Sequence, residues 1–329
     1  MKNKILITGA TGFIGSHLAE FCVEKGFSVV AFDRYNSNNN WGWLENSKYK
    51  NEMEIILGDV RDYDSVSKAI KGCNIVFHLA ALIGIPYSYI SPLAYIRTNV
   101  EGTYNVLESA KNHGSDQILI TSTSETYGSA KYVPIDEKHP LSGQSPYAAS
   151  KIAADQLALS YYLSFNLPIK IVRPFNTYGP RQSLRAIIPT IITQALKNNG
   201  NIKLGNLNPT RDFLYVKDAC ASFLEICKSK KLFGEIVNVG VNSEISMKDL
   251  AKKIVKIINC DESTKIKKDS KRIRPTKSEV ERLCCNNKKI LKTTAWKPSF
   301  NLDRGLKETI DWFSEKENLK QYKPDIYNV

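Results

Sequence analysis

The sequence lacks the long hydrophobic runs of membrane and secreted proteins. No apolar run reaches the roughly 20 residues that a transmembrane helix needs. The N-terminal segment MKNKILITG contains an apolar run that is too short for a signal peptide, and glycines follow it where a cleavage site would stand. We therefore expect a cytoplasmic protein that has no membrane partner.

Cysteine and histidine are too scattered to form a familiar metal or disulfide pattern. The seven cysteines include no CxxC pair and leave an odd count, and the four histidines show no metal-ligand spacing. Disulfide staples and a zinc site are both poor interpretations of such a pattern. We expect no bound metal.

Acidic residues are outnumbered by basic ones only in the second half of the chain, which carries a charge of +14 against −1 for the first half. Residues 1–170 hold 15 Lys and Arg against 16 Asp and Glu, whereas residues 171–329 hold 31 against 17. This asymmetry favours an anionic ligand for the second half, although the lysines of 248–271 also suit a solvated surface. Residues 248–292 lack the interleaved aromatics of a nucleic-acid surface, so we expect no nucleic-acid partner.

The first half alternates short apolar runs with helical patterns. The runs are continuous, as is typical of parallel strands buried on both faces. They are KILIT (4–8), VVAFD (29–33), MEIIL (53–57), IVFHLA (75–80), QILIT (117–121) and IKIVR (169–173), and helical patterns cover 14–25, 63–71, 93–112 and 147–165. This order predicts an α/β fold with a doubly wound parallel sheet of the Rossmann type.

A glycine triplet, Gly9, Gly12 and Gly15, follows the first expected strand with the spacing GxxGxxG. Glycines there permit a tight turn and let a diphosphate approach the backbone N–H groups of a helix N-terminus, although a plain strand–helix junction would also use them. Asp33 ends the second strand, where it can bind the adenosine ribose, and Asp59 ends the third strand, where it can contact adenine. Together these residues predict a bound dinucleotide.

The residues after the second strand bear on the choice of cofactor. The carboxylate of Asp33 would repel a 2′-phosphate, which favours NAD. Arg34 stands beside it and could instead accommodate NADP. We expect NAD, with NADP as the less favoured alternative.

The pattern loosens beyond residue 173, which suggests a second lobe. We expect residues 1–173 and about 212–240 to form the dinucleotide-binding domain, with EIVNVG (235–240) returning to the sheet. Residues of about 174–211 and 241–329 are then expected to form a smaller α/β substrate lobe.

The segment SPYAASK places Tyr147 and Lys151 one helical turn apart on one face. A phenol has a pKa near ~10, so it needs a neighbouring cation before it can act as a base near neutral pH. Lys151 can supply that charge and also hold the nicotinamide ribose. A pair of surface residues is the alternative in isolation, but the dinucleotide motifs upstream favour a catalytic role.

The chain resembles the extended short-chain dehydrogenase/reductase family over essentially its whole length. The resemblance rests on the glycine triplet, Asp59, HLAA (78–81), Asn99, Thr123 and the YxxxK pair, in that order. It implies that Thr123, Tyr147 and Lys151 are catalytic and that Thr123 polarises the C4 oxygen of a sugar. The cofactor-binding residues that we expect are Gly9, Gly12, Phe13, Ile14, Gly15, Asp33, Arg34, Asp59, Val60, Leu79, Ala80, Ala81, Asn99, Tyr147 and Lys151.

The stretch Thr123-Ser124-Glu125 resembles the signature of sugar-nucleotide 4,6-dehydratases, whereas epimerases usually carry a small or apolar residue in place of the acid. The resemblance implies that Glu125 removes the C5 proton after C4 has been oxidised. Ser124 supplies no second carboxylate, so Glu125 would also serve the leaving C6 hydroxyl. The alternative role for Glu125 is a surface ion pair.

A closer resemblance points to the dehydratases of legionaminic-acid biosynthesis, which act on GDP- or UDP-linked N-acetylglucosamine. It is carried by YNSNNNWGWLE (35–45), IPYSY (85–89), PIDEKHPL (134–141), RPFNTYGPRQ (173–182) and TRDF (210–213). We interpret WGW (41–43) as a loop anchored by its aromatic side chains, with a subunit contact as one candidate role. The resemblance also implies a homo-oligomer, a dimer or a tetramer.

The resemblance also implies which residues bind the nucleotide sugar. Besides Ser124, these are Asn176, Arg181 and Arg211, with either Arg274 or Arg282 clamping the diphosphate. Some of these arginines could instead brace loops. Two rival functions remain, namely a nucleotide-sugar 4-epimerase of the same fold and, more remotely, a non-catalytic protein that binds a dinucleotide or nucleic acid.

Overall fold

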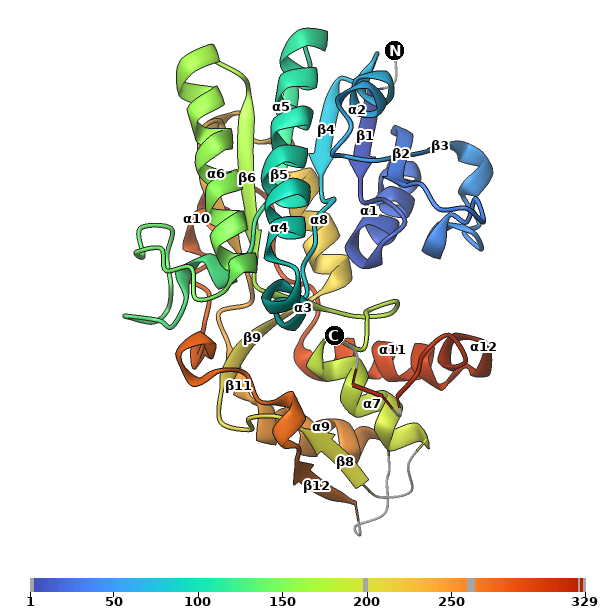
Figure 1. Cartoon of the computed structure of the whole chain (residues 1–329), viewed down its shortest axis with the longest axis vertical. Coiled ribbons are helices and arrows are strands. Elements are labelled where there is room, and N and C mark those ends of the chain that lie inside the picture. The colour runs from blue at the N-terminus through green and yellow to red at the C-terminus, as the bar shows by residue number, and fades with distance from the viewer. Residues whose placement is uncertain (1–2, 198–200, 259–263, 325, 328–329) are drawn as a thin grey trace.

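A seven-stranded parallel sheet with helices on both faces forms the centre of the computed structural model, which describes residues 3–197, 201–258, 264–324 and 326–327 (Figure 1). The strand order is β10-β6-β5-β4-β1-β2-β3. The strands are β1 (Lys4–Thr8), β2 (Ser28–Arg34), β3 (Met53–Gly58), β4 (Ile75–His78), β5 (Gln117–Thr121), β6 (Ile169–Pro174) and β10 (Ile236–Val239). The expected doubly wound α/β fold is confirmed.

Helices cover the two faces of this sheet in separate groups. Helices α1 (Phe13–Glu24) and α8 (Val216–Lys228) pack on one face, and α2 (Tyr63–Ile70), α5 (Gly102–His113) and α6 (Pro146–Phe165) pack on the other. In β1, Ile5 and Ile7 join the core that contains Leu18 of α1, whereas Leu6 joins the core that contains Val106 of α5. Successive strand residues point to opposite faces, so a strand covered on both sides is apolar throughout.

The region expected as one helix over 93–112 is divided in the structure. It consists of α4 (Pro92–Tyr95), a π-helical turn η3 (Ile96–Glu101) and α5, and α3 (Ile85–Ile90) precedes it. The π turn carries Asn99, whose Oδ1 accepts a hydrogen bond from the Leu82 N–H at 2.8 Å and whose Nδ2 donates to Ser150 Oγ at 2.9 Å. Asn99 is thereby fixed between the chain after β4 and helix α6. Single π turns often mark functional sites, and hydrophobic periodicity does not reveal them.

The C-terminal lobe lies below the large sheet in Figure 1 and contains two small sheets. Strand β9 pairs with β7, β11 and β13, and β8 pairs with β12. The elements of the lobe are β7 (Asn176–Tyr178), α7 (Ile187–Lys197), β8 (Asn201–Leu204), β9 (Thr210–Tyr215), β11 (Glu244–Ser246), α9 (Met247–Ile258), β12 (Lys265–Lys268), β13 (Arg282–Leu283), α11 (Leu302–Ser314) and α12 (Lys316–Leu319). Helix α10 (Lys288–Thr293) instead packs against β10 of the large sheet. The chain returns to the large sheet through α8 and β10, and the exact division into two domains stays a prediction.

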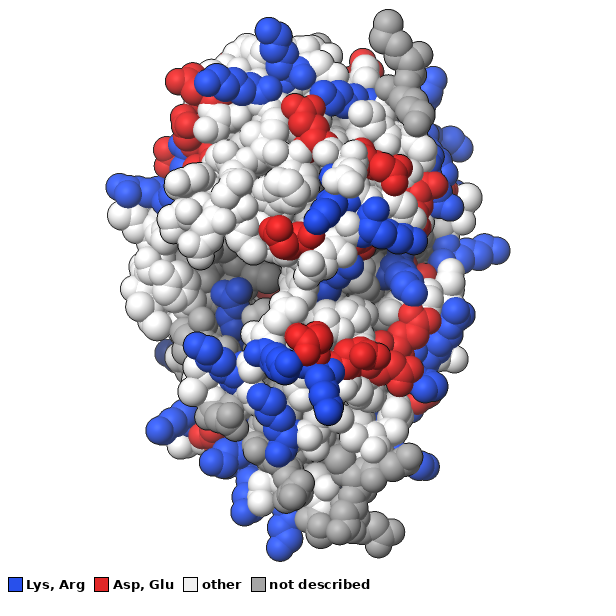
Figure 2. Space-filling view, turned by 90° about the vertical axis from the view of Figure 1, so that its right-hand side faces the viewer, with Lys and Arg blue, Asp and Glu red and all other residues white. Residues whose placement is uncertain are grey.

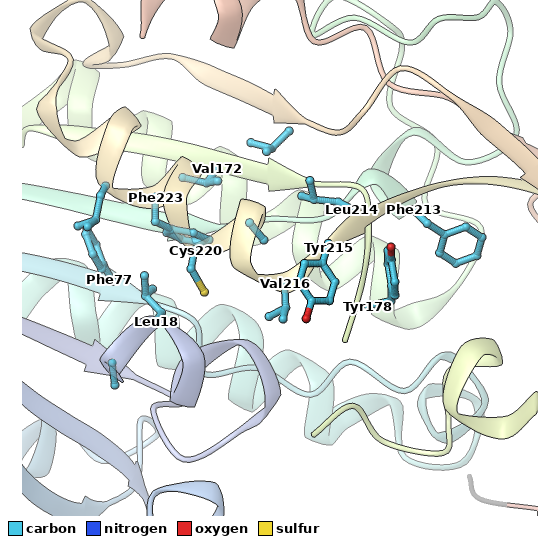
Figure 3. Close-up of a cluster of buried hydrophobic side chains, with 14 of the residues drawn as sticks. Leu18, Phe77, Val172, Tyr178, Phe213, Leu214, Tyr215, Val216, Cys220 and Phe223 are labelled. Carbon is cyan, nitrogen blue, oxygen red and sulfur yellow. The ribbon is translucent and has the colours of Figure 1, made fainter. Parts of the chain in front are cut away.

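One hydrophobic core runs from the large sheet into the C-terminal lobe. Phe77 and Val172 of the sheet belong to the same buried cluster as Tyr178 and Tyr215 of the lobe, and Phe223 of α8 also belongs to it (Figure 3). The rings of Phe77 and Phe223 lie 5.9 Å apart, and those of Tyr178 and Tyr215 lie 5.5 Å apart. The lobes are therefore joined by continuous packing, which limits how freely they can move.

A buried ion pair fastens β6 to α6. Arg173 Nη2 lies 2.6 Å from Asp155 Oδ2, and both side chains are completely buried. The same carboxylate oxygen accepts a hydrogen bond from Ser122 Oγ at 2.5 Å, and the Arg173 guanidinium lies 4.7 Å from the centre of the Tyr127 ring. Buried charges need such additional partners because their removal from water is costly.

We predict that Asp155→Ala lowers the free energy of unfolding by about 3–5 kcal/mol, because it leaves the Arg173 charge buried and unpaired. The matched control is Asp311→Ala, which removes a carboxylate paired with Lys307 on the exposed face of α11 and should cost less than about 1 kcal/mol. Urea denaturation measures both changes. Equal losses for the two variants would contradict this account of the pair.

Candidate active site

The strand order reverses between β1 and β4, so the carboxyl ends of these strands frame the crevice in which α/β sheets bind ligands. Two glycines make the turn after β1 fit there. Gly9 has a φ of +71°, and a Cβ atom on it would lie 2.8 Å from the Ala80 nitrogen. A Cβ atom on Gly15 would lie 2.0 Å from the Gly9 oxygen.

The N-terminus of α1 is open to a ligand. Its N-cap residue is Gly12, and no side chain caps it. The first backbone N–H groups of a helix lack partners within the helix, and they attract anions. This arrangement fits the diphosphate of a dinucleotide.

Two acids follow the neighbouring strands. Asp33 Oδ2 accepts hydrogen bonds from the Thr11 N–H and the Thr11 hydroxyl, both at 2.7 Å, so the acid and the glycine turn hold each other. Arg34 is exposed beside it. Asp59 pairs with Arg61, which lowers the pKa of its carboxyl group.

The structure brings the expected cofactor residues to the same edge of the sheet. Phe13 and Ile14 begin α1, and Val60 follows β3. The run Leu79, Ala80 and Ala81 follows β4, and Asn99 forms a hydrogen bond with the chain just after that run. Tyr147 and Lys151 lie in the first two turns of α6. The sequence did not predict the hydrogen bond from Thr11 to Asp33. It also did not predict an open pocket, which is lined by Asp59, Arg61, Asp62, Arg97 and Glu101. Asp59 was expected at the cofactor site from its place after β3, whereas the other four pocket residues carry no sequence signal.

The catalytic candidates meet where β5 ends. Thr123 caps the short helix η4 (Ser124–Tyr127) by accepting a hydrogen bond from the Glu125 N–H at 3.2 Å. Tyr147 of α6 is only 7% exposed, and its hydroxyl forms a hydrogen bond with Thr123. Lys151, one turn later, is 4% exposed and donates a hydrogen bond from Nζ to the Thr121 carbonyl at 2.6 Å.

The pKa of Tyr147 departs from the sequence-based expectation. Burial raises this pKa, and the nearby Glu125 carboxylate raises it further, while the hydrogen bond with Thr123 opposes both effects. Burial also lowers the pKa of Lys151, against an opposing effect of Asp155. The phenol alone is therefore a weaker acid than free tyrosine, because desolvation is the largest of these effects.

Glu125 lies beside Tyr147 with its carboxylate unpaired. The side chain is 9% exposed, and within the described part of the chain its carboxylate forms neither an ion pair nor a hydrogen bond. The Glu125 carboxylate raises the pKa of Arg211, although burial lowers that pKa by more. Ser124, next to it, is buried as well. The expected alternative, a surface ion pair, does not describe this residue.

Two of the expected substrate arginines share one carboxylate. Glu279 Oε1 lies 3.9 Å from Arg211 Nη2 and 3.8 Å from Arg274 Nη1. Arg211 is 6% exposed. Because the two guanidinium groups share the single Glu279 carboxylate, a positive charge remains close to Glu125. Sequence reasoning missed Glu279, since no local pattern connects it with residue 211.

The other candidates are placed differently. Arg282 is held at the surface by Glu244, with Nε 2.8 Å from Oε1. Arg181 contacts Ser16 and Glu20 of α1, both at 3.0 Å. Asn176 has a buried Oδ1 atom that accepts no hydrogen bond, so it can still receive one from a ligand.

The described helices include none that is long and apolar enough to cross a membrane. Among the same described residues, no cluster of three His, Cys, Asp or Glu side chains could hold a metal ion. Cys260 lies outside the described residues. Lys and Arg side chains gather over the lower part of the face drawn in Figure 2, where the C-terminal lobe lies.

Known proteins match the chain over nearly its full length. The pattern of the GDP-mannose 4,6 dehydratase family matches residues 6–309. A UDP-N-acetyl-alpha-D-glucosaminuronate decarboxylase of Bacillus cytotoxicus is 33% identical, and the match covers 97% of this chain and 100% of the relative.

Two solved structures share the fold and 27% identity. The dTDP-glucose 4,6-dehydratase DesIV of Streptomyces venezuelae, solved with NAD bound, superposes with a TM-score of 0.88 over 96% of this chain and 98% of that protein. The UDP-N-acetylglucosamine 4-epimerase of Methanobrevibacter ruminantium gives a TM-score of 0.85 over 98% and 100%. The relatives thus perform three different reactions on nucleotide sugars.

The family match, the glycine turn at the switch point of the sheet and the Thr-Tyr-Lys arrangement agree with one another. The chain belongs to the GDP-mannose 4,6-dehydratase family, within the extended short-chain dehydrogenase/reductases.

Proposed function

We propose that the protein is a 4,6-dehydratase that converts a nucleotide-linked sugar into its 4-keto-6-deoxy derivative. The observation that carries the proposal is the placement of Glu125, a nearly buried carboxylate without a protein partner, beside Tyr147. An unpaired carboxylate at such a depth costs free energy. A dehydratase needs an acid–base group there, whereas a 4-epimerase has no proton to move at C5.

In the proposed reaction, Tyr147 accepts the proton of the sugar C4 hydroxyl while Thr123 donates a hydrogen bond to the oxygen that becomes the ketone. The glycine turn, Asp33 and Lys151 would hold NAD+, which would supply an acceptor for the C4 hydride until that hydride reaches C6, and a positive charge that lowers the pKa of a nearby phenol. Glu125 then removes the C5 proton, which the C4 ketone has made acidic. The same carboxyl group gives this proton to the C6 hydroxyl, which leaves as water. When the hydride has reached C6, a solvent proton is added at C5 and Tyr147 releases its proton to solvent.

The diphosphate of the substrate would bind between the lobes at Arg211 and Arg274. Both guanidinium groups lie near the Glu279 carboxylate, at 3.9 and 3.8 Å, which is too far for hydrogen bonds with it. A diphosphate would bind both groups through strong charge-assisted hydrogen bonds. Asn176 adds a buried carbonyl oxygen that lacks a hydrogen-bond partner. We propose Arg274 in preference to Arg282 because Glu244 already engages Arg282.

We propose GDP- or UDP-linked N-acetylglucosamine as the substrate. Support comes from the segments that resemble the dehydratases of legionaminic-acid biosynthesis, and from relatives that act on UDP-linked N-acetylated sugars. Incubation with each nucleotide sugar, followed by mass spectrometry, tests the proposal. We expect a product lighter by one water molecule; a product of unchanged mass and inverted C4 configuration would favour the epimerase.

We predict that NAD binds at least about ten-fold more tightly than NADP, because the Asp33 carboxylate repels a 2′-phosphate. Asp33→Asn should narrow this difference by removing the charge while keeping the shape. Titration calorimetry with both dinucleotides gives the dissociation constants. Tighter binding of NADP to the unmodified protein would contradict the assignment and point to Arg34.

We predict that Glu125→Gln slows water elimination by ~10²–10⁴-fold, the usual loss when a positioned acid or base is removed. The first oxidation should survive, so reduced cofactor and the 4-keto sugar should accumulate on the enzyme, where absorbance detects them. In heavy water the unmodified enzyme should place deuterium at C5 of the product. A Glu125→Gln variant that dehydrates at nearly the original rate would remove Glu125 from the mechanism.

We predict that Arg211→Ala raises the KM for the nucleotide sugar by about 10- to 150-fold, the loss of a buried charge-assisted contact of roughly 1.5–3 kcal/mol. The matched control is Arg282→Ala, which removes a guanidinium from the same small sheet but at the exposed surface. Its KM should stay within about two-fold of the original value, since an exposed pair contributes little. Equal effects of the two substitutions would refute the proposed diphosphate site.

A further inference from the structure

The WGW loop after β2 contributes to an aromatic contact between the cofactor half of the chain and the C-terminal lobe. Trp43 lies in the short helix η1 (Gly42–Leu44). Its ring centre is 5.5 Å from that of Trp312 on α11, in an edge-to-face arrangement, and 6.3 Å from that of Tyr322, in a stacked arrangement. We call Trp43, Trp312 and Tyr322 the aromatic clasp. Figure 1 shows α11 and α12 below α1, on the side of the sheet where β2 and β3 lie.

The backbone of the same loop touches the cofactor turn. The Trp43 N–H donates a hydrogen bond to the Thr11 carbonyl at 3.1 Å. Gly42 has a φ of +53°, and a Cβ atom on it would lie 2.8 Å from that carbonyl oxygen, so the two backbones are in direct contact. Thr11 in turn donates the two hydrogen bonds that Asp33 Oδ2 accepts, and the Arg34 N–H donates one to Oδ1. Trp43 therefore connects the clasp to the acid that faces the cofactor ribose.

The turn that Thr11 belongs to needs such external support. Glycines at positions 9, 12 and 15 leave its backbone with much conformational freedom, which has to be lost before a diphosphate can bind. A contact that orders this turn in advance lowers the entropic cost of binding. The clasp is a rigid aromatic anchor for that contact, because its rings pack on each other and on Phe313.

We propose that Trp43 is a positioning residue for NAD. The clasp holds Thr11, and through it Asp33, in the geometry that cofactor binding requires, although neither Trp312 nor Tyr322 belongs to the cofactor site. Linkage makes the effect reciprocal, so NAD binding stabilises the segment from α11 to Tyr322. The proposal depends on NAD binding alone and is independent of the reaction catalysed.

The lobes have a second connection, which lets the clasp be removed without separating them. Arg181 of the C-terminal lobe is bonded to Ser16 and Glu20 of α1. Leu44, which follows Trp43, is completely buried and anchors η1 in the main core. We therefore expect Trp43 variants to fold.

The test compares Trp43→Ala, Trp43→Phe and Tyr322→Ala with a matched control, Tyr49→Ala. Tyr49 is an aromatic residue of the same segment, but its hydroxyl bonds to Glu24 of α1 and its ring lies outside the clasp. Calorimetric titration with NAD should show weakening by about three- to ten-fold for Trp43→Ala and Tyr322→Ala, the range for a lost aromatic pair. Trp43→Phe should restore most of the affinity, and Tyr49→Ala should leave it within about two-fold.

Hydrogen exchange supplies a readout that a purely structural role would not change. NAD should slow amide exchange in α11 and α12 of the unmodified protein, and this protection should disappear in Trp43→Ala. The double variant with Tyr322→Ala should bind NAD no more weakly than Trp43→Ala, since both remove one connection. A folded Trp43→Ala protein with unchanged NAD affinity and unchanged protection would overturn the proposal; if it does not fold, Tyr322→Ala decides by the same two measurements.

Discussion

The buried ion pair between Arg173 and Asp155 holds together the elements that carry the catalytic groups. It joins β6 to α6, and Ser122 extends it to the end of β5. Tyr147 and Lys151 reach the site from α6, whereas Thr123 and Glu125 reach it from the chain after β5. Together with the hydrogen bond from Lys151 to the Thr121 carbonyl, this pair sets the relative positions of base, hydroxyl and acid.

The burial that positions Tyr147 and Lys151 also disfavours the charged forms that catalysis requires. Desolvation raises the pKa of Tyr147 and lowers that of Lys151, so both groups are biased toward their neutral forms. The chain alone does not generate a reactive phenolate, and a positive charge has to arrive with the oxidised cofactor. Arg211 and Arg274 remain charged near the shared Glu279 carboxylate, and we propose that they bind the diphosphate of the substrate.

The sequence predicted the features that depend on short local patterns of residues. Continuous apolar runs predicted the parallel sheet, and the glycine triplet predicted the turn at its switch point, because both depend on neighbouring residues. It could not predict the π turn at Asn99 or the role of Glu279 between two arginines, since these depend on backbone detail and on contacts distant in sequence. The choice between Arg274 and Arg282 was open for the same reason, and only the partner of each guanidinium distinguishes them.

The most direct test of the central claim follows a deuterium label placed at C4 of the nucleotide sugar. An internal redox cycle predicts a product that has lost one water molecule and carries the label at C6, with no net change in the cofactor. Magnetic resonance of the purified product locates the label. Deuterium found again at C4 of an intact sugar, or released in free reduced cofactor, would contradict the assignment of this protein as a dehydratase.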